Sequence, residues 1–403
     1  MAVASEPGEV DEELERLVRL EHFDDALAAA RRLVNGAELT FGRESRETAE
    51  ALSRQARVLR ASGRNGDAAS SYREAVEILR TVEGPLTPLA IEPLAELGEA
   101  YQAADGHFEA LATFREARSL SRRIYGLYGE EQLDLIDRMT AALQSEGRHQ
   151  EADELQREGM AIVTRNHPED SPAALEATYK YAEWLGGMRL YDEQRDYYRR
   201  ALHIIRNREG KDSERLIEPL RALGNSYRVQ RLPEPSGVAS LKEALEILAK
   251  QPQPDPLEMA GLLRDLGDWA ITFGLTDRNS YRRAWRALDG VEDAGAIRDQ
   301  WFSGLQYVLR APVDPRNFTN QADAPSGYVL ASITIDALGH ARDPVILESV
   351  PAGIKDEAVL KHLRESRFRP QLVDGELDAQ RRVLGRFTFR YATGEKARQA
   401  KGP

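Results

Sequence analysis

The stretch that decides the fold is Ile91-Glu92-Pro93-Leu94-Ala95-Glu96-Leu97-Gly98-Glu99-Ala100-Tyr101. Its pattern returns as Ile217-Glu218-Pro219-Leu220-Arg221-Ala222-Leu223-Gly224-Asn225-Ser226-Tyr227. The two copies lie 126 residues apart, which is three times 42. Self-similarity at a period of this size is typical of stacked helical hairpins. The sequence therefore predicts a repeat array rather than one folded core.

Small residues follow the same 42-residue spacing along the chain. Steps of 42 residues link Ala26, Ala68, Ala110 and Ala152, and also Ala75, Ala117, Gly159 and Ala201, while bulky residues recur at Tyr72, Phe114 and Tyr198. Small side chains in register allow two helices to approach closely, which argues against the alternative of a generic helical bundle. The fourth unit departs from the pattern, because Thr140, Gln156 and Gly159 stand at signature positions.

Each unit is expected to form two amphipathic helices with a short turn between them. In the second unit the helices are predicted over residues 47–61 and 67–81. Glycines near the turns are expected to supply the positive φ that a helix end needs: Gly63, Gly106, Gly147, Gly187 and Gly274. The period predicts about seven hairpins between residues 9 and 290.

The spacing of Gly98, Tyr101, Ala110, Phe114 and Ala117 resembles the tetratricopeptide repeat, and the 42-residue period resembles its kinesin-light-chain-like form. The resemblance implies a right-handed superhelical array over residues 9–310 that binds a protein or peptide on the concave face, lined by the first helix of each hairpin. By register, that face is predicted to present Arg54, Arg57, Arg60, Glu99, Gln102, Tyr179, Glu183, Arg221, Asn225 and Arg228. The alternative for each position is an ordinary solvated helix surface.

The periodicity changes from helical to alternating near the end of the chain. A proline-containing linker is predicted over residues 311–325, followed by a small α+β domain over residues 326–392 and a disordered tail over 393–403. Val329, Ala331, Ile333 and Ile335 alternate as one face of a strand, and Asp336-Ala337-Leu338-Gly339 predicts a hairpin turn. A second strand, a helix capped by Asp356 and a last strand complete a β-β-α-β order. Because few apolar residues occupy the linker, the array and this domain are expected to fold independently.

This ending resembles the C-terminal domain of TonB-type energy transducers. The resemblance is carried by Gly327, Asp336, Gly339, Arg367-Phe368-Arg369-Pro370, Gly375 and Phe387-Thr388-Phe389. It implies a periplasmic domain that contacts outer-membrane receptors by pairing a strand with a short receptor segment. The pairing edge is predicted on the last strand, at Arg382, Leu384, Arg386, Thr388 and Arg390. TonB transducers also have a transmembrane helix and a long proline-rich spacer, and this sequence contains neither.

Composition and charge narrow the function classes. The 403 residues are 41% hydrophobic and 30% charged, with a formal net charge of −12, so a nucleic-acid partner is not favoured. From Ser326 onward there are 13 Lys or Arg and 10 Asp or Glu, so the last domain is basic and the rest is acidic. Its arginines fit an acidic partner, the cell-wall polymer or the acidic repeat array itself, or alternatively a solvated face. No apolar run approaches the ~20 residues that span a bilayer.

Location and catalysis leave weaker signals. Ala2-Val3-Ala4 is a small-x-small triplet of the kind that ends a signal peptide, although an ordinary cytoplasmic N-terminus is the alternative. The sequence has no cysteine, and its seven histidines show no metal-ligand spacing, so no catalytic residue, cofactor or metal is predicted. The favoured function is a non-enzymatic periplasmic adaptor. The alternatives are a divergent TonB-type component of energised outer-membrane transport and an unrecognised envelope enzyme.

Overall fold

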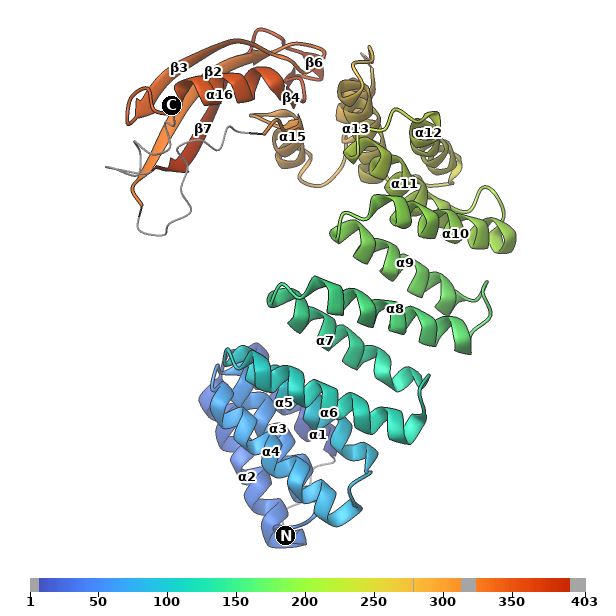
Figure 1. Ribbon diagram of the computed structural model, residues 1–403, viewed down its shortest axis with the longest axis vertical. Helices are drawn as coiled ribbons and strands as arrows, with labels where there is room; N and C mark the ends of the chain where they lie inside the picture. Colours follow the sequence, from blue (N-terminus) through green and yellow to red (C-terminus); the bar gives the residue numbers. More distant parts are fainter. Residues whose placement is uncertain (1–6, 278, 313–323, 392–403) are drawn as a thin grey trace, which may run out of the picture. The chain divides into compact units, whose positions relative to one another are not determined.

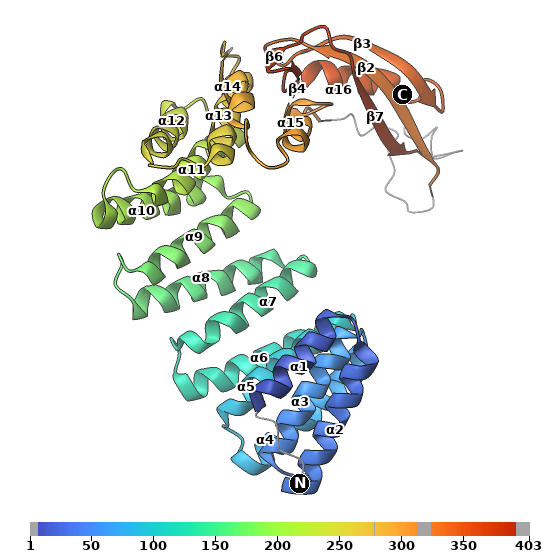
Figure 2. The ribbon, with the colours of Figure 1, turned by 180° about the vertical axis from the view of Figure 1, so that it is seen from behind.

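The computed structural model describes residues 7–277, 279–312 and 324–391, and the chain divides into two compact units at Met188 and Arg189. The first unit is entirely helical (Figures 1 and 2). Its helices are α1 (Pro7–Arg19), α2 (Phe23–Phe41), α3 (Arg46–Ala61), α4 (Asn65–Glu83), α5 (Ile91–Ala103), α6 (His107–Tyr125), α7 (Leu133–Ser145), α8 (His149–Asn166) and α9 (Pro172–Gly187). Short 3-10 turns, η1 (Pro88–Ala90) and η2 (Glu130–Gln132), precede α5 and α7.

The second unit begins with helices and ends with a sheet. Its helices are α10 (Tyr191–Glu209), α11 (Ile217–Val229), α12 (Pro235–Lys250), α13 (Pro256–Thr272), α14 (Ser280–Ala287), α15 (Ala294–Phe302) and α16 (Asp356–Glu365), with η3 (Glu214–Leu216) before α11. Its strands are β1 (Tyr307–Leu309), β2 (Ser326–Ile335), β3 (Ala341–Val350), β4 (Arg367–Phe368), β5 (Leu372–Val373), β6 (Glu376–Leu377) and β7 (Val383–Arg390). In chain order, the described helices pack as hairpins in the pairs α1–α2, α3–α4, α5–α6 and α7–α8 of the first unit and α11–α12 and α13–α14 of the second, and the turn between α9 and α10 falls at the boundary of the units.

The turns between helices repeat one backbone conformation at steps of 42 residues, with a last step of 43. A single residue with positive φ occupies each turn: Glu21, Gly63, Asp105, Gly147, Arg189, Arg231 and Gly274. The prediction that Gly106 and Gly187 would supply this conformation is wrong, because Asp105 and Arg189 adopt it instead, each with a φ of 60°. The register of the hairpin fixes which residue turns left-handed, and a non-glycine residue there carries a steric cost of about 1–2 kcal/mol.

The expected small-residue lattice forms the contacts between helices. Ala26, Ala68, Ala110 and Ala152 are all fully buried. In the third hairpin, the ring of Phe114 on α6 lies directly over Gly98 on α5, so a Cβ at Gly98 would be 2.6 Å from Phe114 Cε1. Here the aromatic ring occupies the space that a side chain at residue 98 would need.

The C-terminal sheet has the strand order β3-β2-β7, with both pairings antiparallel. The expected β-β-α-β order is present as β2, β3, α16 and β7, with the short strands β4–β6 added before β7. The predicted inner face of β2 is confirmed, because Val329, Ala331, Ile333 and Ile335 are buried against Val359 and Leu363 of α16. The predicted turn is also confirmed, since Gly339 N–H donates to the Asp336 carbonyl at 3.0 Å.

Asp356 does not cap α16 as expected. Lys355 stands at the N-cap, and no side chain there accepts a capping hydrogen bond. The Asp356 carboxylate instead accepts a hydrogen bond from Ser349 Oγ at 2.6 Å. This bond ties the start of α16 to the end of β3.

The boundary between array and C-terminal domain differs from the expected one at residue 310. Tyr307–Leu309 forms β1, which pairs with β4, and Ala311 N–H donates to Ser366 Oγ at 3.1 Å. A buried apolar cluster also joins the last hairpin to the domain through Leu263, Ile271, Tyr281, Phe302 and Leu372. The expectation of two independently folding parts overlooked this segment. Most of the predicted linker (residues 313–323) and the predicted tail lie outside the described residues.

Two alanine substitutions test the lattice. Gly98→Ala should lower the free energy of unfolding by about 1–3 kcal/mol, because the added methyl group displaces the Phe114 ring. Gly159→Ala should instead be neutral or stabilising by up to about 1 kcal/mol, since its nearest neighbour would be Ile136 Cγ2 at 3.6 Å. Urea unfolding measures both, and changes of the same sign and size would contradict this packing.

Candidate functional site

The first helix of each hairpin (α3, α5, α7, α9 and so on) is called here the first-position helix. Two arginines that were predicted to line the concave face form ion pairs with carboxylates on the first-position helix of the next hairpin. Arg57 of α3 lies 3.3 Å from Glu96 of α5, and Arg60 lies 2.8 Å from Glu99. Glu99 also contacts Arg138 of α7 at 3.0 Å. Charges of opposite sign thus alternate along α3, α5 and α7, at steps of 39 residues. We call these contacts the ion-pair ladder.

The other predicted positions of the first unit lie outside the ion-pair ladder. Arg54 lies 3.9 Å from Glu50 of its own helix, and Glu183 of α9 is exposed. Gln102 and Tyr179 are half-buried. On the same helix as Tyr179, Lys180 forms an ion pair with Asp137 of α7, which extends the pairing between first-position helices to α9.

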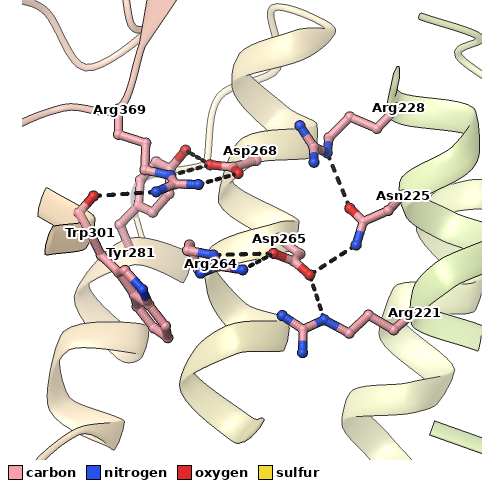
Figure 3. A network of polar contacts seen from close by, with 9 residues as sticks. All are labelled: Arg221, Asn225, Arg228, Arg264, Asp265, Asp268, Tyr281, Trp301 and Arg369. Carbon is pink, nitrogen blue, oxygen red and sulfur yellow. Dashed lines mark hydrogen bonds and ion pairs between the residues drawn. The ribbon is translucent and has the colours of Figure 1, made fainter. Parts of the chain in front are cut away.

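Arg221, Asn225 and Arg228 of α11 belong to a polar network in the second unit (Figure 3). Arg221 Nε donates to Asp265 Oδ2 at 2.6 Å, and Asn225 Nδ2 donates to the same oxygen at 3.0 Å. Arg228 Nε donates to Asn225 Oδ1 at 3.2 Å. Within the described residues, no carboxylate pairs with Arg228, so its terminal nitrogens are the cationic donors of this network that can still receive an anion.

Asp265 of α13 is the centre of this network. Its other oxygen accepts hydrogen bonds from Arg264, whose guanidinium also stacks on Trp301 at 4.4 Å from the ring centroid. Burial alone would raise the pKa of Asp265, but the charges and hydrogen bonds of Arg221, Arg264 and Asn225 outweigh it and lower that pKa. The carboxylate is therefore held ionised in a nearly inaccessible position.

Asp268, one turn along α13, connects the array to the C-terminal domain. Arg369 donates to both oxygens of Asp268 at 2.8 Å, and Tyr281 Oη donates to Oδ1 at 2.8 Å (Figure 3). Arg369 Nη1 also donates to the Trp301 carbonyl at 3.4 Å. Asp268 is 3% exposed and Arg369 14%, so this bidentate pair is largely removed from water.

Sequence reasoning missed Asp265, Asp268 and the pairing role of Arg369. The 39-residue steps from Arg57 to Glu96 and from Arg60 to Glu99 and Arg138 were readable in the sequence as alternating charges. The Arg369–Asp268 pair spans 101 residues and follows no period, so no sequence pattern could indicate it.

Four of the five predicted strand-pairing residues lie on the edge strand β7, and Arg382 immediately precedes it. Because the sheet order is β3-β2-β7, one side of β7 has no strand partner among the described residues. The side chains predicted to line this edge are all exposed: Arg382, Leu384, Arg386, Thr388 and Arg390. An unpaired edge carries backbone donors and acceptors that an incoming strand can use.

A groove of about 470 Å³ runs beside β7. Its apolar wall comes from Leu305, Tyr307, Val359 and Phe387. Its cationic lining is Arg310, Lys355 and Arg386. Arg386 also stacks on Tyr328, with 4.1 Å between its guanidinium carbon and the ring centroid. The groove thus joins an open strand edge to apolar pockets and positive charge.

His362 of α16 borders this groove and is buried. Its Nε2 lies 2.9 Å from Tyr307 Oη, and burial lowers the pKa of His362. The imidazole is therefore neutral at pH 7, and the positive charge of the groove comes from its arginines and lysine.

These arrangements suit binding. Among the described residues, no three or more His, Asp or Glu side chains gather as a metal site would require. In the same part of the chain, every helix is too short or too polar to cross a membrane.

Some of the solved structures that are similar to this chain are described as repeat proteins. One, from Podosopora anserina, is described as a kinesin light chain with nearly identical TPR-like repeats; it is 19% identical, with a TM-score of 0.44, over 52% of this chain and 99% of that one. A TPR repeat-containing protein from Cytophaga hutchinsonii is 10% identical, with a TM-score of 0.47, over 71% of this chain and 98% of that one. The apo form of RapI is 13% identical, with a TM-score of 0.47, over 72% and 79%.

Neither a family model nor a curated relative matches the chain. Because the structural similarities are low in identity and TM-score, the assignment of a tetratricopeptide-like array depends on the 42-residue lattice and the hairpins themselves.

Breaking the Asp268–Arg369 pair should be costly. Arg369→Met leaves a buried carboxylate without its cation and should lower the free energy of unfolding of the second unit by about 3–5 kcal/mol. Adding Asp268→Asn should recover part of this loss, because Asn keeps the Tyr281 hydrogen bond without a charge. Urea unfolding checks both. Arg381→Met on an exposed arginine is the control, and an equal effect there would contradict the assignment.

The lowered pKa of Asp265 predicts a pH dependence. A carboxylate with a depressed folded-state pKa contributes stability above its ordinary value of about 3.9, and this contribution is lost as pH falls through the folded-state pKa. Asp265→Asn should therefore be less stable than wild type near neutral pH, with the gap shrinking towards about pH 3. Thermal unfolding across this range measures the gap. Asp196→Asn, in an exposed ion pair, should show little difference at any pH.

Proposed function

We propose that this chain is a non-enzymatic adaptor of the bacterial cell envelope. Its tetratricopeptide-like array grips a protein or peptide partner, and its C-terminal domain docks to a second protein by strand addition to β7. The observation that carries the proposal is the open edge of β7 beside a groove with apolar walls and cationic lining. An extended acidic segment with alternating apolar side chains complements both features.

Strand addition explains how such an edge binds without a pocket specific for one side chain. Main-chain hydrogen bonds of β7 supply affinity, while alternate side chains of the incoming strand enter the groove at Leu305, Tyr307 and Phe387. Arg386 and Arg390 deter pairing of two copies of this basic edge and favour an acidic partner.

The array contributes a second contact through its polar residues. In the ion-pair ladder, arginine and glutamate satisfy one another, so an incoming carboxylate would have to displace an existing partner. Arg228 has no such partner among the described residues, which makes it the favoured anchor for a carboxylate of the partner. Asn225, fixed between Arg228 and Asp265, holds that anchor in place.

The envelope location is proposed from the TonB-type resemblance of residues 326–392. The β-β-α-β order and the position of β7 at the sheet edge are consistent with that resemblance. Arg367 and Phe368 of the Arg-Phe-Arg-Pro motif form β4, and Arg369 anchors the domain to the array.

Peptide selection followed by titration tests this function. Acidic peptides selected by phage display against the full chain should fall into two groups. One group should lose affinity about tenfold with Arg386→Glu, and the other with Arg228→Glu, each change reversing one charge at its own site. Thr388→Ala should leave affinity nearly unchanged, because strand addition depends on the backbone.

A proline scan separates strand addition from ordinary surface binding. Proline at Thr388 or at Phe387 removes one backbone N–H of β7. Backbone N–H groups of successive strand residues point to opposite sides, so one of these two points away from β2 towards the unpaired edge. The variant that keeps its circular dichroism spectrum should lose the first peptide group and keep the second. Unchanged binding of that group to a folded proline variant would exclude strand addition at β7.

A further inference from the structure

The fourth hairpin lacks the aromatic side chain that the second, third and fifth hairpins carry at the same lattice position. Tyr72, Phe114 and Tyr198 fill the aromatic lattice position, and each is buried. The fourth copy has Gln156 there, and Gly159 stands three residues later, where the second, third and fifth copies have alanine. Compared with the third and fifth hairpins, the fourth therefore lacks one aromatic ring and one methyl group.

A crevice of about 210 Å³ lies at this place, between α7, α8 and α9. Its walls are largely apolar and include Leu133, Ile136, Met160, Val163 and Ala177. By comparison, an engineered apolar cavity of about 150 Å³ binds benzene. The crevice is therefore large enough for one aromatic ring.

Two of the polar side chains that line the crevice, Gln156 and His167, already have partners. Gln156 Nε2 donates to Thr140 Oγ1 at 3.0 Å and to Asp137 Oδ1 at 3.3 Å. At the rim, His167 Nε2 lies 2.7 Å from Glu130. An apolar occupant would leave these hydrogen bonds intact, whereas a polar group would find little to bind.

Lys180 places the crevice next to the proposed binding face. It lines the crevice and also pairs with Asp137 across the first-position helices α7 and α9. A segment lying across that face can therefore direct a side chain into the crevice without leaving the surface.

We propose that this crevice binds an aromatic side chain of the partner segment, which packs over Gly159 and beside the buried Gln156. The proposal rests on the proposed function in that the partner is a protein segment held by the array. Affinity comes from burial of the ring against α7, α8 and α9.

The test uses the full chain and capped amino acids as probes. Binding of N-acetyl-tryptophanamide, N-acetyl-phenylalaninamide and N-acetyl-alaninamide is titrated by saturation-transfer NMR. The two aromatic probes should bind and the alanine probe should not. Gly159→Leu fills the crevice from α8 and should weaken aromatic binding at least about tenfold. Ala161→Leu, at an exposed position of the same helix, is the matched control and should bind as wild type does.

A loss of aromatic binding in Gly159→Leu is not expected to arise from unfolding of the variant. Leucine favours a helix more than glycine does, so Gly159→Leu should keep or raise the thermal midpoint. Ala177→Leu, from the opposite wall on α9, provides a second blocking variant if the first fails to fold.

Three outcomes would overturn the proposal: no aromatic binding to wild type, equal binding to the blocked variants, or binding of free indole without binding of the capped amino acids. Loss of acidic-peptide binding in Arg228→Glu with aromatic binding retained would support both proposals. If Arg228→Glu still binds the acidic peptides, the proposed contact at Arg228 is wrong. The result for aromatic binding in the crevice does not depend on that contact.

Discussion

Close approach of helices through small residues is the constraint on which the rest of the array depends. Buried alanines at 42-residue steps, and Gly98 beneath the Phe114 ring, set the distance between helices. That distance brings Arg57 and Arg60 of one first-position helix within reach of carboxylates on the next. The ion-pair ladder is therefore a consequence of the apolar lattice, and a bulkier residue in the lattice would disrupt both.

The ladder also limits what the array can recognise. Where arginine and glutamate neutralise one another between neighbouring helices, a ligand must compete with an internal partner of good geometry. The two binding positions that we propose lie where the pattern is interrupted, at Arg228 in the second unit and at the crevice of the fourth hairpin in the first. The regular positions instead pair with one another.

The features that repeat along the sequence were predicted correctly, whereas contacts between residues without a regular spacing were not predicted. The hairpins, the buried alanines and the inner face of β2 follow from spacing, because each repeats a local rule. The left-handed turn residues were predicted in part: Gly63 fits, whereas Arg189 shows that the position in the turn can impose the conformation on a residue that does not favour it. The predicted site residues on α11 come together, but their common partner Asp265 was not foreseen.

The junction with the C-terminal domain could not be predicted, because it depends on single contacts between distant residues. Asp268 and Arg369 share no spacing rule, and Tyr307–Leu309 carried no signal that it would pair with β4. The predicted boundary at residue 310 was placed where the composition of the sequence changes. In the structure, residues before this point pack against the C-terminal domain, because Tyr307–Leu309 pairs with β4.

This junction has a consequence for engineering the length of the array. In the second unit, the last hairpin cannot be exchanged as freely as the hairpins before it. A hairpin within the array contacts mainly its neighbours, so whole 42-residue modules can be duplicated or deleted there with little effect on distant parts. The pair α13–α14 is different, because it presents Asp268, Ile271 and Tyr281 to a partner that is not a helical repeat. An array lengthened from this chain must therefore grow upstream of α13, with the last hairpin and the C-terminal domain transferred as one piece.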